Sequence, residues 1–392
     1  QLLAHCNGDA AAEQYITQFE RVLAETGTTN LHRAVMVHAQ LVRKDQLQRM
    51  AAIGMIPSFF VAHTYYWGDI HLQNFGERRG SRISPVKDAI DLGMYQGVAE
   101  QLQMDGSNYT LPFRKDWYML FYNKDLFDKA GVAYPSADMT WDEYEELAKQ
   151  MTSGEGSSKV YGTHNHTWQA LVSNWAVQDG KNTLMSEDYS FMKPAYEQAV
   201  RMQDEGIMQS YANLKTGSIH YISVFEQQQC AMLPMGSWFI GTLIQDKEAG
   251  KFGFNWGVTT IPHPEGVEAG ATVGSTTPVA INAKSDDPDL AWEFVKFATG
   301  EEGAMALADN GIFPAASTDA INEKLAAIPG FPEDGTDALN ITSWVLDRPI
   351  DAKMAAVRKV LEEEHDLIMI GEEDVDTGIA NMNQRAQEAR ED

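Results

Sequence analysis

Three histidines of this chain follow short apolar runs that are typical of β-strands, and their side chains are of a type that binds metal ions. His5 follows residues 2–4, His38 follows residues 34–37, and His63 follows residues 56–62. Barrel enzymes place metal ligands at the carboxyl ends of successive parallel strands. The chemistry that such a set would carry is that of a metal-dependent enzyme.

A second set of residues is suited to binding rather than to catalysis. The stretch Cys230-Ala-Met-Leu-Pro-Met-Gly-Ser-Trp-Phe239 predicts a buried strand followed by a helix, with Ser237 as the N-cap and Trp238 in the first turn. A flat aromatic ring beside free helix N–H groups can stack on a sugar while the backbone donors bind its hydroxyls. The alternative is that Trp238 and Phe239 are ordinary core residues.

Further candidates for such a site lie elsewhere in the sequence. Charged groups that form paired hydrogen bonds suit vicinal diols, so we expect Arg114 and Asp116 to bind hydroxyls, with an ion pair between lobes as the alternative. Trp168 or His166 would contribute from the turn before a helix. Gly permits close approach, so residues 274–276 would supply backbone N–H groups. The predicted ligand-binding residues are Trp238, Trp168, His166, Arg114, Asp116, Trp117, Gly274, Ser275 and Thr276.

The sequence lacks the common enzyme motifs. It contains no Gly-x-Ser-x-Gly, no Walker loop, no His-Glu-x-x-His and no dinucleotide-binding fingerprint. We therefore expect a protein that is not an enzyme and has no cofactor.

Length and charge restrict the class of protein further. The chain has 392 residues and a formal charge of −26. Its length predicts two lobes or domains, since a domain commonly has about 150 residues. The negative charge argues against nucleic acid and anionic membrane surfaces as partners, because both attract a positive face. No run of about 18 or more apolar residues occurs, so we expect no direct membrane insertion.

The charge is unevenly distributed along the chain. Residues 1–95 hold nine Lys and Arg and nine Asp and Glu, so the remaining residues carry the whole net charge of −26. This shift predicts two segments of different origin or duty, with a seam near Met94-Tyr95-Gln96-Gly97.

The first segment alternates between strand and helix patterns. We expect strands at residues 2–4, 34–37 and 56–62, and helices at residues 10–25, 44–52 and 84–93. The order βαβαβα implies parallel strands covered by helices.

The second segment contains clear capping signals. Asn123 is expected to cap a helix at residues 125–129 that ends at Gly131, and Thr140-Trp-Asp-Glu143 is a capping box for a helix at residues 142–151. We expect separate strands at residues 109–114 and 117–122, and a small-residue turn that starts at residue 274 and leads into a strand. Acid-rich helices are predicted at residues 351–364 and 375–390, with residues 362–364 as a solvated face.

The first segment resembles part of a family-3 metal-dependent amidohydrolase, a (β/α)8 barrel. The similar stretches are Leu3-Ala-His-Cys-Asn-Gly-Asp-Ala-Ala11, Val37-His-Ala-Gln40 and Pro57-Ser-Phe-Phe-Val-Ala-His-Thr-Tyr-Tyr-Trp-Gly-Asp69. The resemblance implies that His5 and His38 correspond to metal ligands. However, the family's His-x-His strand and final-strand Asp are missing here, and a zinc or iron site needs about three or four protein ligands. We therefore expect no bound metal, with His5 and His38 as vestigial residues.

The second segment, from about residue 97 to residue 392, resembles a family-1 extracellular solute-binding protein. The similar stretches are Leu111-Pro-Phe-Arg-Lys-Asp116, Tyr122-Asn-Lys-Asp-Leu-Phe-Asp-Lys-Ala-Gly131, Thr140-Trp-Asp-Glu-Tyr-Glu-Glu-Leu-Ala148, Met232-Leu-Pro-Met-Gly-Ser-Trp238, Pro262-His-Pro264, Val273-Gly-Ser-Thr-Thr-Pro278 and Ala291-Trp-Glu-Phe-Val-Lys-Phe-Ala298.

The second resemblance implies the fold and the function that we expect. The fold is α/β, with the two lobes of a periplasmic-binding-protein-like protein and an atypical N-terminal βαβαβα segment at residues 1–95. Residues 97–392 would form the solute-binding region, with the first lobe incomplete, and residues 1–95 would dock there as a surrogate half-lobe or remain a passenger. The implied function is that of an extracellular or periplasmic receptor that binds a carbohydrate ligand and delivers it to the membrane permease of an ABC importer. The alternatives are a degenerate amidohydrolase and a non-functional chimera.

Overall fold

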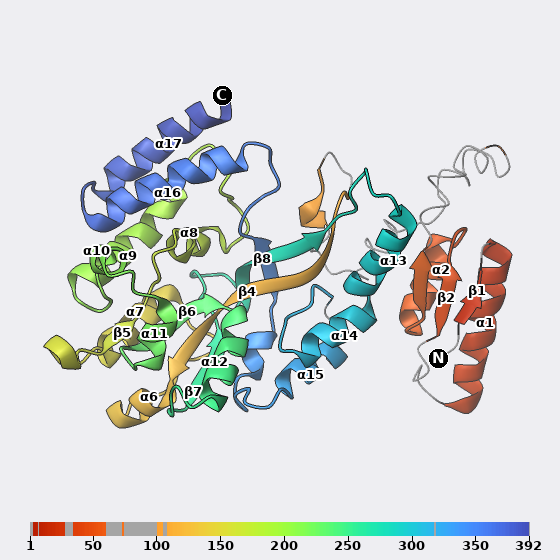
Figure 1. Cartoon of the computed structure of the whole chain (residues 1–392), viewed down its shortest axis with the longest axis horizontal. Helices are drawn as coiled ribbons and strands as arrows, with labels where there is room; N and C mark the ends of the chain where they lie inside the picture. The colour runs from red at the N-terminus through yellow and green to blue at the C-terminus, as the bar shows by residue number, and fades with distance from the viewer. Residues whose placement is uncertain are drawn as a thin grey trace. The chain divides into compact units, whose positions relative to one another are not determined.

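Two units make up the computed structural model of the chain, Gln1–Ala99 (unit 1) and Glu100–Asp392 (unit 2) (Figure 1). The structure describes residues 3–6, 8–27, 34–59, 73, 100–104, 108–316 and 319–391. Three sequence predictions lie outside these residues: His63, the helix at residues 84–93, and the seam near residues 94–97.

Unit 1 contains, among its described residues, a parallel three-stranded sheet in the order β1-β2-β3. Leu3 pairs with Val35, and Val35 pairs with Ile56. This confirms the alternation of strands and helices expected for the first half of the segment. The elements are β1 (Leu3–His5), α1 (Asp9–Thr26), β2 (Val35–His38), α2 (Lys44–Ala52) and β3 (Ile56–Phe59).

The two helices of unit 1 are joined by both apolar and charged contacts. Ile16 of α1 and Met50 of α2 are fully buried in the core of the unit. Beside this core, Arg49 forms ion pairs with Glu13 at 2.5 Å and with Glu20 at 2.6 Å. Hydrogen bonds from Gln46 and Arg49 lower the pKa of Glu13 to about 2. The two helices thus form one layer beside the sheet.

Unit 2 is a larger α/β unit, and the described residues form a six-stranded sheet in the order β5-β6-β4-β8-β9, with β7 paired to β4. β4 is antiparallel to β6, β7 and β8, whereas β5 pairs with β6, and β9 with β8, in parallel. The strands are β4 (Leu111–Asn123), β5 (Tyr161–Thr163), β6 (Cys230–Gly236), β7 (Trp256–Thr260), β8 (Ala271–Val279) and β9 (Ser343–Leu346). The helices are α6 (Lys124–Ala130), α7 (Trp141–Met151), α8 (Ala170–Val177), α9 (Lys193–Asp204), α10 (Tyr211–Thr216), α11 (Tyr221–Glu226), α12 (Trp238–Glu248), α13 (Pro288–Thr299), α14 (Glu301–Asp309), α15 (Asp319–Ala326), α16 (Met354–Ile370) and α17 (Val375–Glu391).

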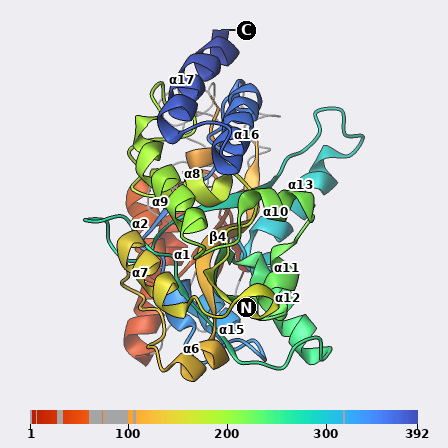
Figure 2. The same ribbon diagram turned by 90° about the vertical axis from the view of Figure 1, so that its left-hand side faces the viewer.

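The central strand β4 serves two hydrophobic cores, because successive residues of a strand face opposite sides of the sheet. Met119 and Phe121 pack in a core with residues of α12, α14 and α15. Leu120 and Tyr122 pack in a second core with residues of α7, α9 and α16. Figure 2 shows α7 and α12 on opposite sides of β4. The sheet of unit 2 is therefore a middle layer between two layers of helices.

The prediction of two separate strands at residues 109–114 and 117–122 is wrong, because β4 is one continuous strand. The charged residues between the two apolar runs suggested a break. In the structure they remain in the ladder, where Arg114 pairs with Thr277 and Asp116 with Ser275. Arg114 and Asp116 neutralise each other, since Arg114 Nε lies 2.8 Å from a carboxylate oxygen of Asp116.

The small residues from position 274 on lie within β8 and not in a turn, so this prediction is also wrong. Gly274 pairs with Trp117 of β4 and with Leu346 of β9. A Cβ at Gly274 would lie 2.0 Å from the carbonyl oxygen of Asp116 and 2.3 Å from Trp344 Nε1. Glycine is thus required here by the close approach of neighbouring groups, as a sheet residue.

Candidate functional site

Three aromatic side chains meet at the end of β6. This strand ends at Gly236 and α12 begins at Trp238, so Trp238 lies at the predicted junction between strand and helix. Its ring is edge-on to that of Tyr118, with centroids 5.7 Å apart, and its centroid lies 6.3 Å from that of Trp168. Trp238 Nε1 donates a hydrogen bond to the hydroxyl of Tyr221 over 3.3 Å. Tyr118 of β4, Trp168 of the loop before α8 and Trp238 of α12 together form an aromatic surface, which we name the aromatic wall.

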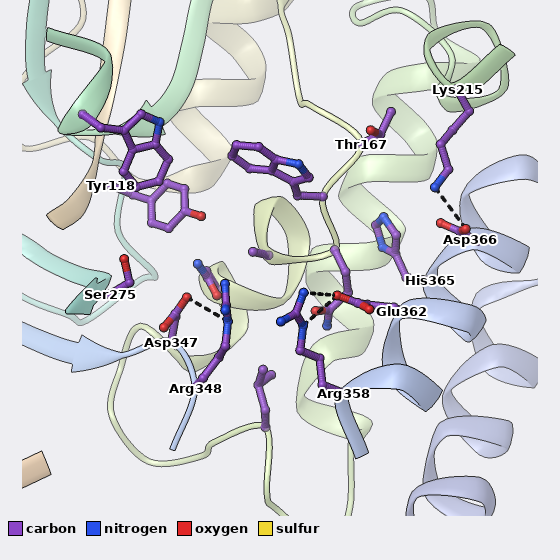
Figure 3. Close-up of a pocket in the computed structure, with 16 residues that line it drawn as sticks. Tyr118, Thr167, Lys215, Ser275, Asp347, Arg348, Arg358, Glu362, His365 and Asp366 are labelled. Atoms are coloured by element: carbon purple, nitrogen blue, oxygen red, sulfur yellow. Dashed lines mark hydrogen bonds and ion pairs between the residues drawn. The ribbon is translucent and has the colours of Figure 1, made fainter. Parts of the chain in front are cut away.

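The aromatic wall borders a cavity of about 510 Å³ in unit 2. A cavity of this volume suits a small-molecule ligand. Figure 3 shows Tyr118 on one side of the cavity and Lys215, His365 and Asp366 on the other. The lining residues are Tyr118, Thr167, Trp168, Gln169, Ala170, Asn174, Leu184, Lys215, Trp238, Ser275, Asp347, Arg348, Arg358, Glu362, His365 and Asp366.

The charged groups of the lining are arranged in pairs of opposite sign. Within the described lining, each Lys or Arg side chain lies beside a carboxylate, so the cavity has no uncompensated cation there. Burial raises the pKa of the carboxyl of Asp347. The pairs are Arg348–Asp347 at 3.5 Å, Arg358–Glu362 at 2.6 Å and Lys215–Asp366 at 3.1 Å.

Three uncharged polar side chains of the lining, Gln169, Asn174 and His365, are buried with unsatisfied hydrogen-bonding atoms among the described residues, which for Gln169 is Nε2 alone. Asn174 of α8 is 1% exposed, and neither its Oδ1 nor its Nδ2 has a partner among the described residues. His365 of α16 is 2% exposed, with Nδ1 3.2 Å from the hydroxyl of Tyr196 and with Nε2 unpartnered in the described chain. Burial lowers the pKa of His365 to about 3, so the ring is neutral at pH 7.

Three of the predicted ligand-binding residues, Trp238, Trp168 and Ser275, line the cavity. His166 does not line it, but its ring packs edge-on against Trp168 with centroids 4.8 Å apart. Burial lowers the pKa of His166 to about 4. His166 is therefore placed to support the aromatic wall from behind as a neutral ring.

Ser237 does not cap α12, contrary to the prediction. Its Oγ donates a hydrogen bond to Asp116 Oδ1 over 2.8 Å and makes no capping bond. Asp116 is 5% exposed, and a buried carboxylate strongly favours hydrogen-bond donors. The carboxylate of Asp116 therefore takes both Ser237 and Arg114, and neither Asp116 nor Arg114 belongs to the lining.

The structure places the other predicted residues of β4 and β8 within the sheet and its core. Trp117 is 4% exposed, and its Nε1 donates to the carbonyl of Ala338 over 3.0 Å. Thr276 Oγ1 donates to the carbonyl of Arg114 over 2.7 Å. Gly274 is held between β4 and β9. Trp117, Gly274 and Thr276 therefore support the strand that carries Ser275.

Sequence reasoning missed the contribution of α16. Arg358, Glu362, His365 and Asp366 are spaced i, i+4, i+7 and i+8, so they share one helical face, and all four line the cavity. The interpretation of residues 362–364 as a solvated face is wrong for Glu364, which is 1% exposed and paired with a guanidinium of α17, whereas Glu362 is partly exposed and lines the cavity. The sequence did contain a signal for this face: His365 follows Arg358 by seven residues and Glu362 by three, a spacing that places all three on one side of a helix.

His5 and His38, the histidines of unit 1 that the structure describes, lie close together. The rings of His5 and His38 have centroids 4.9 Å apart, at the carboxyl ends of β1 and β2. Among the described residues, no group of three or more His, Cys, Asp or Glu side chains is placed to hold a metal ion. No helix among the residues that the structure describes, in either unit, is long and apolar enough to cross a membrane.

Comparisons with known proteins support both sequence resemblances. Residues 78–305 match the family model of bacterial extracellular solute-binding proteins, which confirms the resemblance of the second segment. Residues 1–98 match the amidohydrolase family model, which covers about a quarter of the chain.

Individual relatives and solved structures agree with the first of these matches. The sn-glycerol-3-phosphate-binding periplasmic protein UgpB of Brucella melitensis is 24% identical over 341 residues, which are 78% of this chain and 75% of that protein. The open form of a sugar transporter from Rhizobium etli is 33% identical, covers 98% of both chains and has a TM-score of 0.73. An ABC substrate-binding protein of Listeria monocytogenes, in complex with cycloalternan, is 18% identical over 88% of this chain and 94% of its own, with a TM-score of 0.65. The expected α/β fold of a two-lobe binding protein is thereby confirmed.

Proposed function

The chain belongs to the family of bacterial extracellular solute-binding proteins, and from that premise we propose that it is the carbohydrate receptor of an ABC importer. In this proposal the protein works outside the cytoplasmic membrane. It captures a sugar in the cavity of unit 2 and delivers it to a membrane permease.

The aromatic wall is the observation that carries this proposal. Sugar rings present apolar C–H faces that stack on aromatic side chains, while their hydroxyls need directional donors and acceptors. Trp168 and Trp238 offer the rings, and Trp168 is 39% exposed although it is a large apolar residue. The rest of the lining offers polar groups, with Ser275 and Asp347 on the side of Tyr118 and His365 and Asp366 across the cavity (Figure 3).

The pairing of charges favours an uncharged ligand. Lys215, Arg348 and Arg358 each have a carboxylate neighbour, so an anionic ligand would have to displace that neighbour or lie beside it. Hydroxyl groups can both donate to the carboxylates and accept from the cations. A neutral polyol therefore matches this lining better than a phosphate does.

The relatives support the same class of ligand. The similar protein from Rhizobium etli is named as a sugar transporter, and that from Listeria monocytogenes was solved with cycloalternan. The Brucella relatives are named for sn-glycerol 3-phosphate, at a lower identity than the Rhizobium protein.

We further propose that the chain has no enzymatic activity and needs no cofactor. Its relatives in the solute-binding family are receptors. The match to the amidohydrolase family covers residues 1–98, about a quarter of the chain, and the described part of that segment contains no group of three or more side chains placed to hold a metal ion.

Calorimetric titration of the purified chain tests the proposed function. The panel is glucose, mannose, maltose, mannobiose and glycerol 3-phosphate. We expect saturable binding of at least one of the neutral sugars. A folded protein that binds none of the sugars in the panel would contradict the proposal.

A further inference from the structure

The cavity contains buried polar atoms that the protein itself leaves without partners. In Asn174, both the donor Nδ2 and the acceptor Oδ1 are unsatisfied in the described chain, although the side chain is 1% exposed. A buried polar group without a hydrogen bond costs free energy, and proteins satisfy nearly all such groups. An asparagine that is unsatisfied at both atoms and lines a cavity therefore points to a ligand that supplies the missing partners.

His365 provides another unsatisfied group of the same cavity, in which Gln169 Nε2 is also unpartnered among the described residues. Tyr196 is the neighbour of its Nδ1, at 3.2 Å, while its Nε2 has no partner in the described residues. The neighbouring charges, Asp366 and Lys215, are paired with each other at 3.1 Å and so do not offer the ring a free counter-ion. Buried as it is, the ring is neutral at pH 7, and it offers one uncharged hydrogen-bonding atom to the cavity.

We propose that Asn174 and His365 form a subsite that recognises two adjacent, unmodified hydroxyl groups of an uncharged sugar. This inference rests on the proposed function, and it names the residues that determine specificity. One hydroxyl accepts from Asn174 Nδ2 and the next donates to Asn174 Oδ1, while His365 Nε2 binds one of the pair. A vicinal diol has this arrangement of donors and acceptors on neighbouring atoms.

The same subsite rejects ligands that are modified at this position. At pH 7 a phosphate group offers almost exclusively hydrogen-bond acceptors. Asn174 Oδ1, which is itself an acceptor, would therefore face it without a donor. The lining cations are already paired with Asp347, Glu362 and Asp366, so they offer a phosphate no free positive charge in compensation. A site built to bind a hydroxyl rejects an analogue without it strongly, because the buried partner is then left unpaired.

The test compares three variants of the full chain with the parent protein. Asn174→Ala removes both unsatisfied atoms, and Asn174→Asp keeps the shape and one acceptor but removes the donor. Ser173→Ala is the matched control, because Ser173 is the adjacent residue of α8, is fully buried and does not line the cavity. Affinity is measured by calorimetry for the neutral sugars and glycerol 3-phosphate, and melting temperature is measured without ligand.

We expect both Asn174 variants to bind the preferred neutral sugar about 10- to 100-fold more weakly, since each loses a hydrogen bond that leaves a partner unpaired. We expect the melting temperature of Asn174→Ala without ligand to be unchanged or higher, because the atoms that are removed had no partner. Ser173→Ala should keep its affinity.

Three outcomes would overturn the inference. If the parent binds a sugar and Asn174→Ala binds it equally well, the subsite is refuted while the proposed function stands. If the parent prefers glycerol 3-phosphate to every sugar, the hydroxyl specificity is refuted. If Asn174→Ala loses affinity only in proportion to a large drop in melting temperature, and Asn174→Asp binds normally, the residue is structural. Failure of the parent to bind any panel compound contradicts the proposed function itself.

Discussion

The indole ring of Trp238 lies against the backbone of Gly236, where the chain passes from β6 to α12. A Cβ at Gly236 would lie 2.0 Å from the nearest ring atom, which is far closer than van der Waals contact. The position of the aromatic wall therefore depends on the absence of a side chain two residues earlier.

Gly236→Ala should displace the Trp238 ring and weaken sugar binding by about tenfold or more, because a shifted platform loses contact with the ligand. Calorimetry with the preferred sugar measures the effect. Gly241→Ala in α12 is the matched control, since a Cβ there has no heavy atom within 4 Å. That variant should gain about 1 kcal/mol of stability from helix propensity and keep its affinity. Equal affinities for both variants would mean that the position of the ring does not matter for binding.

Trp238→Ala should weaken binding by about 2–4 kcal/mol, or about 30- to 1,000-fold, as for the truncation of an aromatic hot spot. Trp256→Ala serves as the contrast, because Trp256 is 4% exposed and does not line the cavity. The contrast variant should lose about 3–5 kcal/mol of folding stability without a specific effect on affinity. An unchanged affinity for Trp238→Ala beside a large drop in melting temperature would make Trp238 a packing residue.

The sequence was most informative where the controlling chemistry is local. Asn123 caps α6 by accepting from Leu126 N, and the capping box of Thr140 and Glu143 begins α7, both as predicted. Each needs only residues three positions apart. The position of Trp238 at the junction followed from the same local reasoning.

The predictions failed where distant partners decide the structure. Ser237 has the residue type of a helix cap, yet Asp116, 121 positions away, takes its hydroxyl. The charged residues Arg114 and Asp116 suggested a break between two strands, but both pair with residues of β8 and lie within one continuous strand. Part of the polar lining of the cavity comes from α16, where His365 lies beside the hydroxyl of Tyr196, 169 positions away. No local pattern contains these contacts.

Stability should fall as the pH drops below about 6.5, because His164 and His365 are buried as neutral rings. Burial lowers the pKa of each to about 3, and His164 also faces His166 and His220. Above the unfolded value of about 6.5 neither state binds the proton, whereas between about 6.5 and 3 the unfolded state binds it first. Each histidine should therefore cost about 2 kcal/mol of stability between pH 6.5 and pH 5.

Melting temperatures between pH 8 and pH 5 check this prediction. His164→Phe, which keeps an aromatic ring but cannot titrate, should show a flatter dependence on pH than the parent. Parallel curves for the two proteins would show that His164 has no part in the acid sensitivity.

The purified chain should carry no stoichiometric zinc or iron, since a catalytic site needs about three or four ligands and no group of three such side chains is placed to hold a metal ion among the described residues. Elemental analysis after purification without chelators measures the content. A finding of about one metal ion per chain that is lost in His5→Ala would support a hydrolase site instead.

A chain that starts at residue 98 should bind the preferred sugar as tightly as the full chain, because the lining residues that the structure describes all lie between Tyr118 and Asp366. Calorimetry on the shortened protein measures the affinity, and its melting curve shows whether it folds. Normal folding and affinity would mean that residues 1–97 are a passenger. A shortened chain that is folded but binds more weakly, or that fails to fold, would instead support the docking of residues 1–95 as a surrogate half-lobe.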